Sequence, residues 1–305
     1  MPKIYYKDKK SEKLSEISSL RKGSWLHLDN ANEEKLVDLC NTLKLDEAIV
    51  KDILDKHEVP RIEREDGIHY IFTRISDTPS GLSATTPLLI IITQDIFITI
   101  SHDKSNLIET FLQKEYFLTT QKTKLSIQLF LFINQDYQNA IRKISKEIRN
   151  ATKDIENIKN KDVTKLVRYE AIFNDYLSAL EPGNITLEKL LSGKYLTLYE
   201  EDRDLVEDLF IDNSQLIDEC QMFLKHIVNV RDAYTTIISN NLNKTMKLLT
   251  SVTAILTVPT MIASFYGMNV GLPLENSPYG FIVVVGLSAF ISMFLLILFL
   301  KKDMF

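Results

Sequence analysis

The sequence predicts an α+β fold in which an N-terminal α/β domain is followed by a long helical stalk and two C-terminal transmembrane helices. Charged residues are absent from 248–274 and again from 276–300, but they are frequent in the preceding 247 residues. Strand-like alternation is confined to roughly the first 120 residues, and helical periodicity dominates from Lys124 onward. We therefore predict a cytosolic α/β domain at 1–120, a cytosolic helical region including the stalk at 121–245, and a transmembrane hairpin at 246–305.

The first region alternates strand and helix patterns. Residues 24–29 (SWLHLD) alternate as a strand does, and a helix with one apolar face follows an asparagine cap, with Leu36, Leu39, Cys40 and Leu43 on that face. A second helix is expected over 46–56, a strand over 70–75, and two strands within 88–101 that are joined by a tight turn at Gln94-Asp95. These elements predict helices packed on a small, partly antiparallel sheet.

The second region reads as long helices. Residues 126–158 keep a helical period without Gly or Pro, and 163–180 are expected to form the antiparallel return. Glu181-Pro182-Gly183 should end that return, and 187–198 should form a short connector. From Glu201 no Gly or Pro interrupts the pattern until Pro259, and Gly267 is the expected stop. At 1.5 Å per residue such a helix would be roughly 100 Å long.

Two segments are long enough to cross a bilayer, which needs roughly 20 apolar residues per helix. They are 248–266 and 280–300, and the link at 267–279 contains neither Lys nor Arg. Lysines instead flank the pair, at Lys244, Lys247, Lys301 and Lys302. The positive-inside rule then predicts a multi-pass protein of the cell (inner or plasma) membrane with both termini cytoplasmic and an external link.

Other features of the composition narrow the class of protein. The start, MPKIYYKDKK, is too charged for a signal peptide, so the N-terminal part is expected to stay in the cytosol. Cys40 and Cys220 lie far apart in helical patterns and are expected to be reduced. A net charge of −5 argues against nucleic acid as a partner and suits divalent cations.

A polar stripe runs along the first membrane segment. Its members recur at intervals of three and four residues, which places them on one helical face: Asn243, Met246, Thr250, Thr253, Thr257, Thr260 and Ser264. Hydroxyl residues in membrane helices also serve close packing and can bond their own preceding carbonyls. Continuity over about six turns favours the wall of a water-filled path. Because two helices cannot enclose a pore, this reading requires a homo-oligomer in which the second, wholly apolar span faces lipid.

The end of the first span carries a recognisable motif, Tyr266-Gly267-Met268-Asn269. A Gly-Met-Asn tripeptide at the end of the first of two C-terminal spans resembles the CorA family of magnesium transporters. The resemblance extends to 238–246 and 261–269 along the first span. It also covers Trp25 to Asp29 and the Pro-Arg-x-Glu stretch formed by Pro60, Arg61 and Glu63.

The resemblance implies a funnel-shaped homopentamer whose stalk helix continues as the pore-lining span. It implies that Gly267, Met268 and Asn269 form the selectivity filter, with Asn269 receiving hydrated Mg²⁺ at the external mouth. Amide oxygens that bond to the ion's waters suit Mg²⁺, which gives up its water reluctantly. Alignment on the tripeptide matches an inner polar ring, an apolar constriction and a threonine ring to Asn243, Met246, Leu249 and Thr260. Thr257 departs from the family pattern, which has a bulky apolar gate residue there.

Acidic residues raise the question of regulation. Between Glu200 and Glu219 nine acids stand against one base, and Asp204, Asp208 and Asp212 repeat at four-residue intervals on one helical face. Most acids of this kind form a solvated face. Aligned by distance from the tripeptide, Asp208 matches the family's intersubunit regulatory carboxylate, which implies that cytosolic Mg²⁺ bridges protomers and holds the pore closed. Glu275, in the external link, is either a cation-attracting residue or a solvated loop acid.

The sequence shows no enzyme signature and indicates no organic cofactor; Mg²⁺ is expected as both the transported and the regulatory ion, with Co²⁺ and Ni²⁺ as further candidates. Gly-rich phosphate loops, nucleophile elbows and zinc-ligand clusters are absent from the sequence. Two alternatives stay open. One is the related ZntB-like branch of proton-coupled zinc transporters, and the other is a membrane-anchored sensor or scaffold, for which the polar stripe would have no use.

Overall fold

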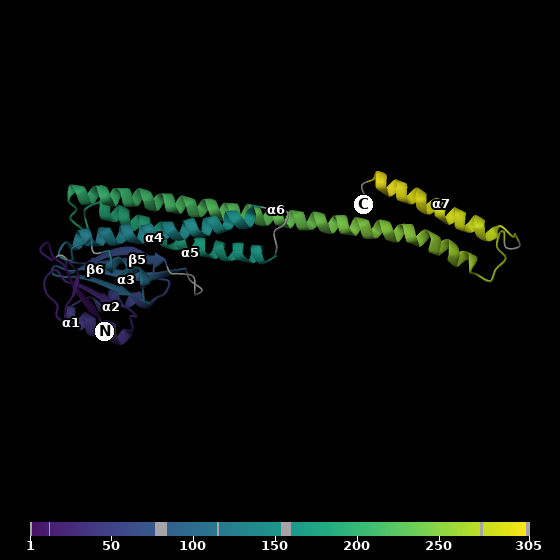
Figure 1. Cartoon of the computed structure of the whole chain (residues 1–305). Coiled ribbons are helices and arrows are strands. Elements are labelled where there is room, and N and C mark those ends of the chain that lie inside the picture. The colour runs from purple at the N-terminus through teal and green to yellow at the C-terminus, as the bar shows by residue number, and fades with distance from the viewer. Residues whose placement is uncertain are drawn as a thin grey trace. The chain divides into compact units, whose positions relative to one another are not determined.

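The computed structural model describes residues 2–11, 13–76, 84–114, 116–153, 160–274 and 277–302. The chain divides into two compact units, residues 1–229 and 230–305 (Figure 1), which are treated separately below. The predicted α+β fold is confirmed, because the first unit holds an α/β domain and the chain ends in a long helix and two apolar helical spans.

A seven-stranded sheet forms the centre of the first unit, with strand order β2-β1-β3-β7-β6-β5-β4. Only β3 and β7 pair in parallel, so the predicted partly antiparallel sheet is confirmed. The sequence analysis missed β1, β2 and β4, which lie toward the two edges. The strands are β1 (Lys3–Tyr6), β2 (Ser15–Glu16), β3 (Trp25–Leu28), β4 (Arg61–Glu65), β5 (Ile68–Ser76), β6 (Thr85–Ile92) and β7 (Phe97–Ser101).

Helices cover both faces of this sheet, with α1 and α2 on one face and α4 and α5 on the other (Figure 1). The predicted cap of α1 is confirmed, since Asn32 accepts a hydrogen bond from the Lys35 amide at 2.9 Å. The helices of this unit are α1 (Glu33–Leu43), α2 (Glu47–Lys51), the 3₁₀ turn η1 (Asp52–Leu54), α3 (Asn106–Leu112), α4 (Lys122–Thr152), α5 (Asn160–Leu191) and the first part of α6 (Glu200–Tyr266).

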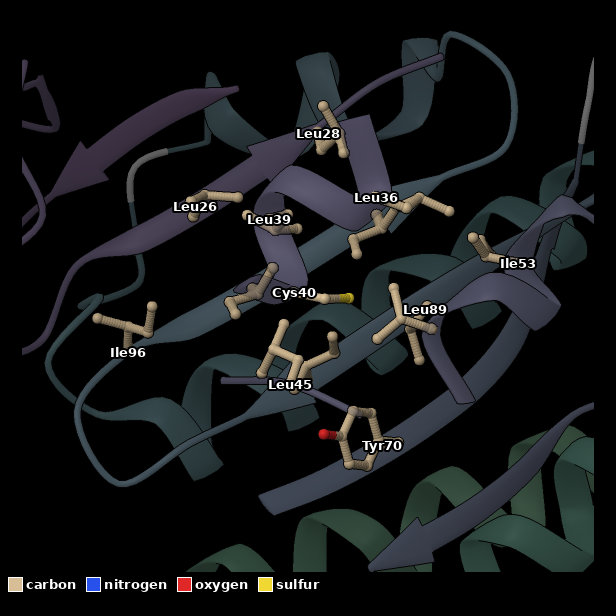
Figure 2. Packing of buried hydrophobic residues seen from close by; sticks show 14 of the residues in the cluster. Leu26, Leu28, Leu36, Leu39, Cys40, Leu45, Ile53, Tyr70, Leu89 and Ile96 are labelled. Atoms are coloured by element: carbon tan, nitrogen blue, oxygen red, sulfur yellow. The ribbon is translucent and has the colours of Figure 1, made fainter. Parts of the chain in front are cut away.

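The core beneath α1 follows from strand alternation. Leu26 and Leu28 of β3 point toward Leu36 and Leu39 of α1, and the intervening strand residues point to the other face (Figure 2). All eight residues of β6 are buried, because this strand lies between β5 and β7 with helices on both faces. Cys40 lies in this cluster, and both cysteines are buried and free, as predicted.

The other face of β3 and β7 contains a buried polar chain. The Trp25 indole donates to Thr99 Oγ1 at 2.9 Å, and Thr99 Oγ1 lies 2.8 Å from His27 Nδ1. His27 Nε2 in turn lies 2.9 Å from Asp29 Oδ1, which also accepts from the Ser101 hydroxyl at 2.8 Å. Burial alone would raise the pKa of Asp29, but His27 and Ser101 outweigh it and hold that pKa at about 2.

Replacing Asp29 by Asn should therefore remove a pH-dependent part of the stability. The folded pKa lies below the unfolded value, so the carboxylate stabilises the fold above about pH 4 and loses this effect as the pH falls toward 2. We expect the free energy of unfolding of the variant to be about 2 kcal/mol lower at neutral pH, and to fall correspondingly less as the pH decreases toward 2. Urea unfolding of the detergent-purified protein, followed by fluorescence of the single tryptophan, Trp25, measures this. Asp38→Asn, at an exposed site on α1, should leave the pH dependence of the free energy of unfolding unchanged. The same pH dependence in the two variants would refute the assignment.

One boundary in the helical region differs from the sequence analysis. The expected break at Glu181-Pro182-Gly183 is wrong, because α5 continues through these residues to Leu191. Asn213 of α6 donates to the Leu180 carbonyl at 2.9 Å and to Asn184 Oδ1 at 3.1 Å, on either side of the proline. Tertiary hydrogen bonds thus support the helix where local propensity would end it.

The second unit contains the remainder of α6, to Tyr266, and α7 (Gly280–Lys301). Both helices are long and apolar enough to cross a membrane, with mean hydropathies of 1.7 and 2.9 over their most apolar windows. Gly280 opens α7 because a Cβ there would lie 2.6 Å from the Leu274 carbonyl oxygen, and Leu274 itself has a left-handed φ of 68°. Leu274 therefore lies close to the start of α7.

Candidate functional site

The predicted polar stripe lies on a face of α6 that α7 does not cover. Thr253, Thr257, Thr260 and Ser264 are all exposed in the single chain. Residues between them, including Ile255 and Val258, are partly buried. The polar face is therefore left for water or for another copy of the chain.

A groove of about 490 Å³ follows this face. Thr253, Thr257, Thr260 and Ser264 line it together with the larger side chains of Leu256, Met261 and Phe265. The structure thus brings four members of the predicted stripe into one continuous concave surface.

The threonine hydroxyls on this face have a defined orientation. Thr253, Thr257 and Thr260 donate to the carbonyls four residues earlier, at 2.8, 2.7 and 2.9 Å. This is the local bond that hydroxyl residues commonly form in membrane helices. Because each hydroxyl proton is used within the helix, its oxygen lone pairs are what the groove offers. Such a surface suits a cation or the hydrogens of its bound water.

Pro259 removes one backbone donor within this span. The carbonyl that it leaves without its usual helical partner is that of Ile255, four residues earlier. Ser292 of α7 donates its hydroxyl to this carbonyl at 3.4 Å, a long but directed contact. The sequence analysis missed Ser292, although a hydroxyl within an otherwise apolar span was a signal for it. α6 therefore continues as a helix through Pro259, and α7 supplies a hydrogen bond in place of the one that the proline removes.

The Gly-Met-Asn turn follows the C-terminal end of the stripe. The Gly267 amide donates to the Ala263 carbonyl at 3.0 Å, and the Met268 amide donates to the Phe265 carbonyl at 3.2 Å, so α6 closes with a tight turn. Gly267 does not adopt a left-handed φ, so the turn does not depend on glycine for that reason. Tyr266 donates its hydroxyl to the Pro273 carbonyl at 3.4 Å, and Asn269 follows with its side chain exposed.

The N-terminal end of the stripe is also exposed along α6. Asn243, Met246, Leu249 and Thr250 have no cover from the rest of the second unit, and the Met246 and Leu249 side chains are 52% and 59% exposed. Two apolar side chains one turn apart could form a constriction only if other copies of the chain bring equivalent residues to the same axis. A single chain encloses nothing at this level.

The acidic positions lie on the surface of α6 in the first unit. Asp204, Asp208 and Asp212 are all exposed on one side of the helix, at successive turns. Within the described parts of the chain, no group of three or more His, Cys, Asp and Glu side chains converges to hold a metal. A metal site at these aspartates would need ligands from another chain. Glu275 lies outside the described residues.

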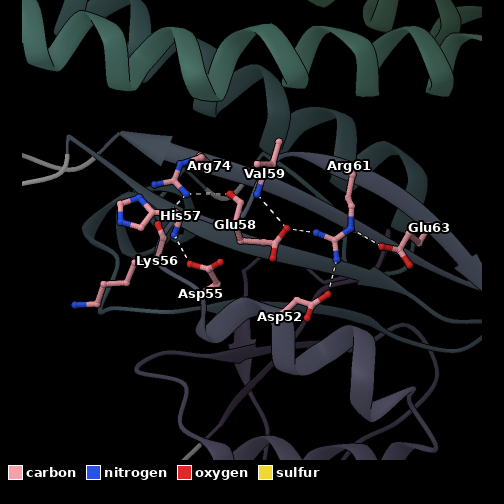
Figure 3. A network of polar contacts seen from close by, with 9 residues as sticks. All are labelled: Asp52, Asp55, Lys56, His57, Glu58, Val59, Arg61, Glu63 and Arg74. Atoms are coloured by element: carbon pink, nitrogen blue, oxygen red, sulfur yellow. Dashed lines mark hydrogen bonds and ion pairs between the residues drawn. The ribbon is translucent and has the colours of Figure 1, made fainter.

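The Pro-Arg-x-Glu stretch has a visible structural role. Arg61, at the start of β4, forms ion pairs with Glu58 and Glu63 and with Asp52 of the 3₁₀ turn, the last at 2.6 Å (Figure 3). Its guanidinium also lies 4.1 Å from the centre of the Phe72 ring. The three carboxylates oppose the effect of burial and raise the pKa of Arg61. The motif thus joins α2 and its 3₁₀ extension to the sheet edge.

Comparison with known proteins gives agreement along nearly the whole chain. The family model described as CorA-like Mg²⁺ transporter protein matches residues 21–302. The cobalt/magnesium transport protein CorA of Methanocaldococcus jannaschii is 27% identical over 292 residues, which cover 91% of this chain and 90% of that protein. The complete structure of the CorA magnesium transporter from Methanocaldococcus jannaschii superposes with a TM-score of 0.85 at 22% identity, covering 98% of this chain and 97% of that one.

A second solved structure shares the fold of most of the chain. The cytoplasmic domain of ZntB from Vibrio parahaemolyticus superposes with a TM-score of 0.64 at 10% identity, covering 78% of this chain and 98% of that one. At this identity the likeness concerns the fold alone. The fold therefore does not distinguish between the two branches.

Proposed function

The chain belongs to the CorA-like Mg²⁺ transporter family, and we propose that it forms a homopentameric channel through which Mg²⁺ flows into the cytosol. Co²⁺ and Ni²⁺ are further candidate ions. In this proposal residues 246–305 form the membrane hairpin, the link at 267–279 faces outward, and both termini lie in the cytosol. Relatives named as cobalt/magnesium transport proteins support the assignment of the ion.

The observation that carries the proposal is the uncovered groove along α6. Its hydroxyl oxygens face outward because their protons are bonded within the helix. A membrane tether would leave such a surface against lipid without a partner, whereas a ring of copies would turn it toward a common aqueous axis. Asn243 lies at one end of this face, and Asn269 lies three residues beyond the last residue of α6, Tyr266, at the other end.

Asn269 is proposed to receive the hydrated ion at the outer mouth, where Gly267, Met268 and Asn269 form the selectivity filter. Mg²⁺ holds its water tightly, so an amide oxygen that accepts a hydrogen bond from a bound water avoids the cost of dehydration. Several copies of Asn269 around one axis would bind several of these waters at once. The membrane potential suffices for influx, since a divalent ion gains about 4.6 kcal/mol per 100 mV.

Regulation is proposed to lie at the aspartates of α6. Cytosolic Mg²⁺ would bind between Asp208 and an oxygen ligand of the neighbouring protomer, with Asp204 and Asp212 on adjacent turns contributing charge. An ion that binds only the closed arrangement shifts the population toward it. Loss of cytosolic Mg²⁺ would then release the bridges and open the path.

Asp208→Ala should leave Mg²⁺ influx intact and weaken its inhibition by cytosolic Mg²⁺, because it removes a ligand and no part of the pore. We expect the half-inhibiting Mg²⁺ concentration to rise about tenfold, the effect of losing about 1.4 kcal/mol of binding. The measurement is influx into proteoliposomes preloaded with graded Mg²⁺. Asp218→Ala, on another side of the same acidic stretch, is the matched control. Inhibition that is unchanged in Asp208→Ala would exclude Asp208 as a regulatory ligand.

Reconstitution tests the function itself. Proteoliposomes with a Mg²⁺-sensitive dye and an inside-negative potential, but no pH gradient, should show Mg²⁺ influx that grows with the potential. Zn²⁺ influx that appears only with an imposed pH gradient would instead place the protein with the proton-coupled zinc transporters. Absence of flux for both ions would favour the sensor or scaffold alternative.

A further inference from the structure

A partly open cavity of about 550 Å³ lies in the first unit, and the cationic residues that line one end of it, Lys143, Lys165 and Arg168, are exposed to solvent. Its walls come from the ends of β5 and β6, the segment that leads into α3, and the facing sides of α4 and α5. Its described lining includes no residue of α6, so it is separate from both the proposed ion path and the acidic face. The volume is that of a small-molecule site, for which about 300 to 1,000 Å³ is usual.

The contacts between α4 and α5 indicate which lining residues lie toward each end of the cavity. The Tyr169 hydroxyl of α5 donates to the Glu147 carboxylate of α4, and the rings of Tyr176 and Tyr137 meet edge to face with centres 5.2 Å apart. This antiparallel register places Phe132 and Tyr176 toward one end of the cavity and places Lys143 toward the other. Eleven residues separate Phe132 from Lys143, about 16 Å along a helix.

One end of the cavity is cationic. Lys143 of α4 and Lys165 and Arg168 of α5 line it, and the only carboxylate near them in the described lining is Glu147, which accepts the Tyr169 hydrogen bond. Lys143 and Lys165 form no ion pair with any described residue. Lys104 also lines the cavity, but it is paired with Glu109 at 3.2 Å. An anion is the group that this end can bind.

The other end combines apolar and aromatic surface with hydroxyl groups. Phe132 and Tyr176 contribute ring surface. Thr86 lines the same region, is only 6% exposed, and its Oγ1 has no hydrogen-bond partner among the residues that the structure describes. A buried hydroxyl without a partner is uncommon and costly, so it points to a group that is supplied from outside the chain. Asp136 accepts from Ser76, and burial raises the pKa of its carboxyl, which limits the negative charge at this end.

We propose that this cavity binds an organic phosphate of nucleotide size. Its phosphate groups would lie between Lys143, Lys165 and Arg168, and its aromatic or apolar body would lie against Phe132 and Tyr176. Lysine and arginine side chains bind phosphate through charge-assisted hydrogen bonds, and the ring surface covers the body of the ligand. A free phosphate would satisfy only one end of the cavity.

Isothermal titration calorimetry on the full chain in detergent, in Mg²⁺-free buffer, tests this with ATP as the probe. Tripolyphosphate and adenosine represent the two halves of the probe, and both should bind more weakly than ATP. Lys143→Ala should weaken ATP binding about tenfold, whereas Lys146→Ala, at an exposed lysine of α4 outside the lining, should not. Ala140→Phe, which fills the cavity without changing its charge, should weaken ATP and adenosine together.

Three results would overturn the proposal. They are the absence of ATP binding at millimolar concentration, equal affinity for ATP and tripolyphosphate, and equal effects of Lys143→Ala and Lys146→Ala. The urea unfolding curve of each variant, followed by Trp25 fluorescence, shows whether a loss of binding reflects a loss of fold. Mg²⁺ influx without nucleotide should be the same in Lys143→Ala and in the wild type, so this test is independent of the proposed channel function.

Discussion

Asn269→Ala should abolish potential-driven Mg²⁺ influx while leaving the protein folded and inserted. Each copy would lose an amide oxygen that accepts a hydrogen bond from the hydrated ion. Such a bond contributes about 1 kcal/mol, and the loss is repeated in every protomer around the mouth. We therefore expect influx to fall by more than about tenfold, measured with a Mg²⁺-sensitive dye in proteoliposomes.

The matched control for this prediction is Asn241→Ala. Asn241 is an exposed asparagine of α6 about half a turn from Asn243, so it lies off the polar face. Its variant should conduct as the wild type does. Influx in Asn269→Ala that equals that of Asn241→Ala would show that the amide at the end of the stripe does not receive the ion.

Arg74→Leu should cause a large loss of stability in the α/β domain of the first unit. Arg74 is 5% exposed, and burial lowers its pKa. It donates to the carbonyls of Lys56, Glu58 and Thr85 at 2.9, 2.9 and 3.0 Å, and to Thr85 Oγ1 at 2.8 Å (Figure 3 shows its place beside the Arg61 cluster). Leucine would fill much of the volume but would remove all four hydrogen bonds, of which the two to Thr85 are buried. The expected loss is about 3 to 5 kcal/mol.

Urea unfolding followed by Trp25 fluorescence measures this loss. Arg64→Leu makes the same change at an exposed arginine of β4 and should alter the free energy of unfolding by less than about 0.5 kcal/mol. Similar losses in both variants would mean that the hydrogen bonds of Arg74 are not what stabilises this part of the fold.

The sequence predicted those helices and strands that depend on residues close together in the chain. The Asn32 cap of α1, the alternation in β3 and the two apolar strands β6 and β7 were all readable from residues close together in the chain. Strands β2 and β4 were missed because they are short edge strands that pair on one side only, and β1 was missed because it is four residues long and has a single buried residue, Tyr5. The error at Pro182 has a related cause, since Asn213, 31 residues later, supplies hydrogen bonds that no local pattern records.

The candidate site was likewise only partly predictable from the sequence. The spacing from Thr253 to Ser264 predicted one helical face, but the position of α7 was needed to show that this face is uncovered. The contact from Ser292 to the Ile255 carbonyl depends on how two spans pack, and the cavity of the first unit is assembled from five separate stretches of chain. Neither arrangement has a signature within one segment.

Cysteine accessibility tests most directly whether the polar face of α6 forms the wall of an ion path. The native thiols do not interfere, because both are buried and burial raises the pKa of Cys40 to about 11 and that of Cys220 to about 12. Thr257→Cys places a thiol on the polar face. Val258→Cys places one on the neighbouring, partly buried side of the helix. A positively charged methanethiosulfonate reagent would be added to conducting proteoliposomes, and labelling would be quantified by mass spectrometry. Rapid labelling that blocks Mg²⁺ influx in Thr257→Cys, with neither effect in Val258→Cys, is the predicted result. Labelling of Thr257→Cys without a block, or equal behaviour of both variants, would contradict the assignment of this face to the ion path.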